Sequence, residues 1–157
     1  MTWSTVCESP AETKALGCRL GSLLRPGDAV LVYGDLGAGK TVLAQGIAAG
    51  LGADRARSPS FALLHRYQGM VPVYHADLYR LHSREELAAL DLSETAADGV
   101  LVVEWPELAE QDFPDGLAVR LSRLPGREET RRVELRANGE HYEGILRELK
   151  SHADLGP

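Results

Sequence analysis

Cysteine is scarce in this chain, and long apolar runs are absent. Cys7 and Cys18 are too few for a disulfide framework, and their spacing does not suit a metal site. No apolar run reaches the ~18 residues that a membrane-spanning helix needs. The first residues, MTWSTVCESPAET, lack the basic and apolar segments of a secretory signal. These absences predict a cytoplasmic protein with reduced thiols and no membrane contact.

Basic residues are outnumbered by acidic ones, 17 against 23, which gives a net charge of -6. An acidic domain is poorly placed to bind nucleic acid directly, because neutralisation of phosphates dominates that affinity. Any nucleic acid involved is therefore expected to belong to a partner. The hydrophobic share of 44% and the length suit one globular domain, which we expect to span residues 1–157.

Helix-start signals and short apolar runs alternate along the chain. Ser9 and Ser83 each precede a glutamate by three positions, the capping-box pattern of a helix start. Apolar runs rich in β-branched residues predict buried strands, and two later segments that alternate apolar with polar residues predict an antiparallel pair. The expected fold class is α/β, with a largely parallel sheet flanked by helices and an antiparallel C-terminal extension. The expected strands lie within 29–33, 71–80, 99–107, 117–123 and 131–137, with a further short strand entered from a loop at 55–61. The expected helices follow Ser9, start near Lys40, and cover 83–90 and 141–150.

A glycine-rich stretch, YGDLGAGKTVLAQG at 33–46, matches the P-loop pattern G-x-x-x-x-G-K-[ST]. Its glycines let the backbone curl so that N–H groups point at a phosphate. Lys40 can supply charge to the β- and γ-phosphates, and the hydroxyl of Thr41 can ligate Mg²⁺. A strand before the loop and a helix after it complete the required setting. The sequence thus predicts a nucleoside triphosphate with Mg²⁺, bound by Gly34, Asp35, Leu36, Gly37, Ala38, Gly39, Lys40 and Thr41.

Acidic residues end two of the predicted strands, where ligands of open α/β sheets bind. Glu104 follows VLVV, as a Walker B acid does, and can hold Mg²⁺ or orient the attacking water. Asp77 ends VYHAD. The simpler interpretations are a solvated strand end for Glu104 and a turn cap for Asp77. His75 is interpreted as structural, and Trp105 either packs on the nucleotide or a partner or belongs to the core.

The absence of the motifs that bind guanine narrows the class of P-loop protein. The only asparagine, Asn138, precedes Gly139, so the guanine-binding motif N-K-x-D is absent, as is D-x-x-G. Adenine is therefore the expected base. Two classes remain: a small-molecule kinase, with SRLPGREETRR at 122–132 as an arginine-bearing lid, and an ATPase that drives a partner protein. The loop at 58–60 occupies the place of a switch loop, although the spacing alone favours a plain connection.

Four motifs occur in a fixed order, namely GDLGAGKT, SPSF, HADLYR and VVEWPE. Together they resemble the bacterial tRNA threonylcarbamoyladenosine biosynthesis ATPase family, TsaE (also called YjeE), from about Glu12 to Glu107. Many proteins share the P-loop, whereas HADLYR combined with VVEWPE is specific. The resemblance implies an ATP-binding and ATP-hydrolysing subunit for threonylcarbamoyladenosine modification next to the tRNA anticodon. In that family the ATPase acts with TsaD and TsaB, and meets tRNA only through the complex.

The resemblance also implies roles for single residues. Lys40 and Thr41 would hold phosphate and Mg²⁺. Where the family usually has S-P-T, this chain has Ser60 in the third position, which keeps the hydroxyl and loses a methyl group. The implied catalytic residues are Asp77, Glu104 and Lys40, the implied metal ligands are Thr41 and Glu104, and the residues implied beside the nucleotide are Trp105 and, near the adenine, Thr13.

Overall fold

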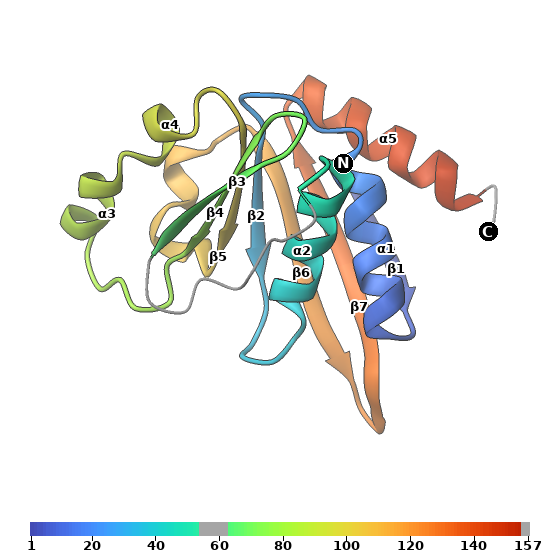
Figure 1. The fold of residues 1–157 in the computed structure, drawn as a ribbon. Helices are drawn as coiled ribbons and strands as arrows, with labels where there is room; N and C mark the ends of the chain where they lie inside the picture. The colour runs from blue at the N-terminus through green and yellow to red at the C-terminus, as the bar shows by residue number, and fades with distance from the viewer. Residues whose placement is uncertain (54–62, 155–157) are drawn as a thin grey trace.

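The computed structural model describes residues 1–53 and 63–154, which form one seven-stranded sheet with helices on it (Figure 1). The strand order is β1-β7-β6-β2-β5-β4-β3. The elements are β1 (Thr2–Cys7), α1 (Pro10–Gly21), β2 (Ala29–Tyr33), α2 (Lys40–Gly50), β3 (Leu64–Gln68), β4 (Pro72–Asp77), α3 (Arg84–Leu90), α4 (Leu92–Thr95), β5 (Val100–Glu104), η1 (Pro106–Leu108), η2 (Glu110–Asp112), β6 (Gly116–Leu124), β7 (Arg127–Asn138) and α5 (Glu140–Asp154).

The sheet is mixed rather than largely parallel. The central pairs β6–β2, β2–β5 and β5–β4 are parallel, and the pairs β1–β7, β7–β6 and β4–β3 are antiparallel. The expected antiparallel extension, β6 and β7, is confirmed. The expectation of a largely parallel sheet is wrong because both edge strands pair antiparallel. The sequence analysis does not predict β1, whose exposed polar residues Thr2 and Ser4 form part of a strand only through pairing with β7.

Helices cover the two faces of the sheet unequally. On one face, α1, α2 and α5 lie over the larger hydrophobic core, to which β2, β6 and β7 contribute (Figure 1). On the other face, a smaller core joins β2, β4 and β5 to α3, α4 and η1. On this second face, β6 and β7 contribute little to the core.

The predicted helix starts are confirmed, since the side chains of Ser9 and Ser83 accept hydrogen bonds from the backbone N–H groups of Glu12 and Glu86.

Glycines bring α1 and α2 into close contact. A Cβ atom on Gly21 would lie 2.2 Å from the carbonyl oxygen of Ile47, and one on Gly46 would lie 2.3 Å from that of Lys14. Only glycine allows backbones to approach so closely. The two helices run side by side in the same direction (Figure 1), so the start of α1 lies at the same end of the molecule as the start of α2.

The parallel strands β2, β4 and β5 present their carboxyl ends at one edge of the sheet. In the register, Glu104 at the end of β5 pairs with Asp77 on one side and Val32 on the other. The stretch 122–132, expected as a kinase lid, instead forms the end of the β6–β7 hairpin. The loop at 58–60 lies outside the described residues. Within 1–53 and 63–154, no helix is long and apolar enough to cross a membrane.

Candidate functional site

The glycine-rich loop connects the buried strand β2 to the start of α2. Gly37 and Gly39 adopt positive φ angles of 79° and 101°, a backbone conformation that side chains disfavour. Gly39 is the N-cap of α2, and its carbonyl accepts the hydrogen bond from the backbone N–H of Leu43. Ala38 is buried under the loop, whereas Leu36 is exposed at its tip. The loop therefore curls directly into a helix N-terminus, the arrangement that favours anions.

Lys40, the first residue of α2, turns its side chain back into this loop. Its ammonium group donates hydrogen bonds to the carbonyl oxygens of Gly34 (2.7 Å) and Asp35 (2.8 Å). It also lies 4.1 Å from the centre of the Trp105 ring. Burial lowers the pKa of Lys40 below its ordinary value, and the nearby carboxylate of Glu104 opposes that shift. The site thus holds a buried positive charge at the mouth of the loop.

Thr41, Glu104 and His75 form a chain of contacts from α2 through β5 to β4. The Thr41 hydroxyl lies 3.1 and 3.2 Å from the two carboxylate oxygens of Glu104. The Nε2 atom of His75 lies 2.5 Å from Oε2 of the same carboxylate. Glu104 and His75 are both buried, so the simpler interpretation of Glu104 as a solvated strand end is wrong. The contacts on both sides fix the orientation of the Glu104 carboxylate.

His75 contacts Glu104 at this site, whereas the sequence analysis interprets it as structural. It lies two positions before Asp77 on β4, so both side chains point to the same face of the sheet. That spacing, together with the alignment of β4 beside β5, is the signal that could have linked His75 to Glu104. The two strands pair only in the folded chain, however, so the sequence alone does not show that His75 lies beside Glu104.

Asp77 lies at the end of β4, beside Glu104 in the register. Its Oδ1 accepts a hydrogen bond from the backbone N–H of Tyr79 at 3.0 Å, which is the contact that the simpler interpretation as a turn cap requires. Burial raises the pKa of Asp77 above its ordinary value, and the charge of Glu104 acts in the same direction. Two carboxyl groups in unlike surroundings therefore meet at this edge of the sheet.

Trp105 follows Glu104 and turns the chain sharply. It is a non-glycine residue with a positive φ angle of 54°, a sparsely populated conformation. Its ring lies 4.9 Å from that of Tyr79 and covers the ammonium group of Lys40. The strained backbone thus places an aromatic face at the loop rather than in either hydrophobic core.

Thr13 is buried in the first turn of α1 and stands apart from the cluster. Its hydroxyl donates to the carbonyl oxygen of Ser9 at 3.3 Å, and no described contact joins it to the glycine-rich loop. Its helix end does lie on the side of the loop, because α1 and α2 run in the same direction (Figure 1).

Two arginines of the β6–β7 hairpin hold the outer side of the loop, and the sequence analysis did not single them out. Arg123 donates to the carbonyl oxygen of Gly37 at 3.0 Å, and Arg131 donates through Nε to that of Ala38 at 2.8 Å. Arg131 also donates to two carbonyl oxygens of its own hairpin, those of Glu128 and Thr130. The hairpin and the loop are thereby tied together.

Comparisons with known proteins agree with these motifs. The sequence model of the family "Threonylcarbamoyl adenosine biosynthesis protein TsaE" matches residues 7–133. A Bacillus subtilis tRNA threonylcarbamoyladenosine biosynthesis protein TsaE is 36% identical over 99% of this chain and 97% of its own length. The protein of the same name from Mycobacterium leprae is 42% identical over 77% of this chain and 83% of its own. A crystal structure of Bacillus subtilis YdiB superposes with a TM-score of 0.79, at 31% identity and over 98% of this chain and 97% of that one.

These matches span the loop, both strand-end carboxylates and most of the sheet. They confirm the resemblance to the family and the expected part in threonylcarbamoyladenosine biosynthesis, and they give no support to the small-molecule kinase alternative. The family sequence model covers well over half of the chain, and the Bacillus subtilis relative aligns along almost all of it. This chain therefore belongs to the TsaE family of threonylcarbamoyladenosine biosynthesis proteins.

Proposed function

We propose that this chain is a single P-loop ATPase domain over residues 1–157, and that it binds and hydrolyses ATP as a subunit of a tRNA-modifying complex. The observation that carries the proposal is the contact between Thr41, in the last position of the P-loop motif, and Glu104 at the end of β5. It joins the P-loop to a strand-end acid, which is the arrangement that phosphoryl-transfer proteins use.

The loop would hold the triphosphate. Its backbone N–H groups and the start of α2 favour negative charge, and the ammonium group of Lys40 would exchange its two carbonyl partners for phosphate oxygens. Buried ammonium groups bind phosphate strongly because little water competes with them. The proposed nucleotide-binding residues are Thr13, Gly34, Asp35, Leu36, Gly37, Ala38, Gly39, Lys40, Thr41 and Trp105.

Thr41 and Glu104 would hold Mg²⁺. Their hydroxyl and carboxylate oxygens lie within 3.2 Å of each other and are the hard ligands that this ion prefers. Two protein oxygens suffice, because Mg²⁺ keeps several waters and takes further ligands from the phosphates. When bound, Mg²⁺ would neutralise charge that develops on the phosphates.

The remaining polar groups would orient Glu104 and the attacking water. His75 positions the Glu104 carboxylate through its 2.5 Å contact. Asp77, whose pKa is raised by burial, lies beside Glu104 and is the other proposed catalytic carboxylate. Trp105 would pack its ring against the nucleotide next to Lys40.

The proposed partners are a TsaD-like and a TsaB-like protein, with tRNA held by them. The family's part in this modification supports the proposal, as does the net charge of -6, which disfavours direct binding of tRNA. A partner that completes the site would raise a slow intrinsic rate of hydrolysis.

The test is to reconstitute the complex. ATP hydrolysis is measured for this chain alone, with the purified TsaD–TsaB pair, and with the pair and tRNA, while the modified nucleoside is assayed. We expect turnover to be slow alone and to rise with the pair. If the pair does not bind this chain, and repeated rounds of modification proceed equally well without it, the proposal is wrong.

A further inference from the structure

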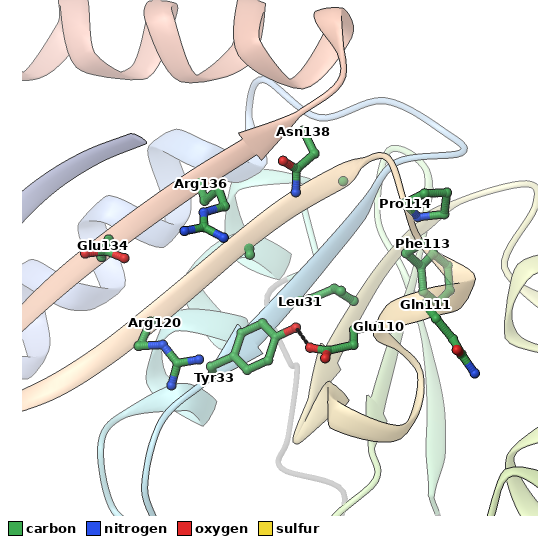
Figure 2. A pocket seen from close by; sticks show the side chains of 12 residues that line it. Leu31, Tyr33, Glu110, Gln111, Phe113, Pro114, Arg120, Glu134, Arg136 and Asn138 are labelled. Atoms are coloured by element: carbon green, nitrogen blue, oxygen red, sulfur yellow. Dashed lines mark hydrogen bonds between the residues drawn. The ribbon is translucent and has the colours of Figure 1, made fainter. Parts of the chain in front are cut away.

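A groove lies on the second face of the sheet, where the covering helices end. It runs between the strands β2, β6 and β7 and the segment 110–114, and has a volume of about 480 Å³ (Figure 2). Its floor includes the apolar side chains of Leu31 and Ala118, and Phe113 and Pro114 form part of one wall. The groove therefore has an apolar base that reaches solvent.

Two arginines stand at this groove with free hydrogen-bond donors. Arg120 and Arg136 are exposed, and the side chain of neither makes a hydrogen bond or ion pair with any residue in 1–53 or 63–154. The Arg120 guanidinium lies 4.8 Å from the centre of the Tyr33 ring, which fixes its place but uses none of its donors. A planar guanidinium with free donors fits a carboxylate or a phosphate in two-pronged fashion.

Acidic groups on the same groove help to decide whether the arginines bind a carboxylate or a phosphate. Glu134 lies opposite Arg120 in the register, and Glu110 is held at the wall by a 2.6 Å hydrogen bond from the Tyr33 hydroxyl (Figure 2). A nucleic-acid backbone would bring a row of phosphates against both carboxylates, at a cost in repulsion. A protein segment can place an acidic side chain on each arginine and an apolar one on the floor. Interfaces between proteins combine an apolar centre, arginines and a polar rim in this way.

We propose that this groove binds an acidic segment of the protein partner. The occupant is an extended stretch of the TsaD–TsaB pair that carries carboxylates for Arg120 and Arg136 and an apolar side chain for the floor. The proposal rests on the proposed function for the identity of that pair. Tyr33, which lines the groove, directly precedes Gly34, the first residue of the glycine-rich loop.

The experiment reverses the charge of the groove. The double variant Arg120→Glu/Arg136→Glu is compared with Arg19→Glu/Arg147→Glu, which makes the same change in net charge at two exposed arginines of α1 and α5, on the other face. Affinity for the purified TsaD–TsaB pair, for tRNA alone and for ATP is measured by calorimetry, together with the melting temperature. A milder double variant, Arg120→Gln/Arg136→Gln, serves if the reversal impairs folding.

We expect the groove variant to lose at least ~10-fold in affinity for the pair and the control less than ~2-fold, with ATP affinity unchanged in both. Equal binding of the pair by the groove variant and the control overturns the groove assignment and leaves the proposed function intact. A loss of affinity confined to tRNA overturns it in favour of a nucleic-acid site. If the unaltered chain does not bind the pair at all, the proposed function fails, and this occupant fails with it.

Discussion

Charged side chains have opposite surroundings in two regions of the molecule. At the glycine-rich loop, Lys40 and Glu104 are 5% and 3% exposed, and each is held by several contacts. On the groove, the side chains of Arg120 and Arg136 are exposed and make no hydrogen bond or ion pair with the described residues. Both regions share β2, whose last residue, Tyr33, lies between them.

The difference follows from what burial costs. A buried charge without partners is expensive, so the groups at the loop must be paired before any ligand arrives. That pairing fixes their geometry in advance, as catalysis of phosphoryl transfer requires. Exposed arginines remain hydrated at little cost and gain only when a partner removes them from water. The loop thus suits a small ligand of fixed shape, and the groove suits a partner surface that binds reversibly.

The largest expected effect comes from removing the charge at the loop. We expect Lys40→Ala to weaken ATP binding by ~100-fold or more, because about two charge-assisted hydrogen bonds to phosphate are lost. Arg120→Ala, the matched change on the groove, should leave ATP affinity unaltered. Isothermal titration calorimetry measures both, and circular dichroism checks that each variant is folded. An unchanged ATP affinity in Lys40→Ala would remove this lysine from the proposed site.

A second prediction distinguishes the role of Glu104 in Mg²⁺ binding from any role in nucleotide binding. We expect Glu104→Ala to lower Mg²⁺-dependent ATP turnover by ~10- to 100-fold, since the Thr41 hydroxyl loses its carboxylate partner and Mg²⁺ a ligand. Nucleotide affinity measured in EDTA should change by less than ~3-fold, because the loop contacts remain. Glu104→Gln keeps the shape without the charge and should show the same division between turnover and binding. Equal losses in both measurements, or in neither, would show that Glu104 is not a metal-site acid.

The sequence predicts the glycine-rich loop and the acids at the neighbouring strand ends far better than it predicts the groove. The P-loop has a fixed spacing that each functional group requires, and the strand-end acids follow from apolar runs that stop at Asp77 and Glu104. The contacts that these residues make are harder to predict from the sequence. His75 reaches Glu104 only because β4 lies beside β5, a pairing between segments far apart in the chain.

The groove leaves almost no local signal. Its arginines alternate with buried residues along β6 and β7, as on any half-exposed strand. Whether such a face is covered depends on how many helices pack there, and α3 and α4 stop short of it. The edge strand β1 was missed for a related reason, because its polar side chains form a strand only through the register with β7.

The smallest expected effect concerns Arg131, which joins the glycine-rich loop to the β6–β7 hairpin. Its 2.8 Å hydrogen bond to Ala38 holds the loop from outside, and its bonds to Glu128 and Thr130 anchor it in the hairpin. Losing one such bond costs about 1 kcal/mol of loop organisation, so we expect Arg131→Ala to weaken ATP binding by ~3- to 10-fold.

Arg127→Ala is the matched control for this change, since Arg127 belongs to the same hairpin but pairs with Glu8, away from the loop. Its ATP affinity should match that of the unaltered chain. Arg131→Lys should fall between the two, because a lysine keeps the charge and lacks the fork that reaches both loop and hairpin. Because Arg131 is hydrogen-bonded to the backbone of the loop, turnover at saturating ATP should change less than the KM for ATP. Equal ATP affinities for Arg131→Ala and Arg127→Ala would mean that the loop keeps its shape without the hairpin.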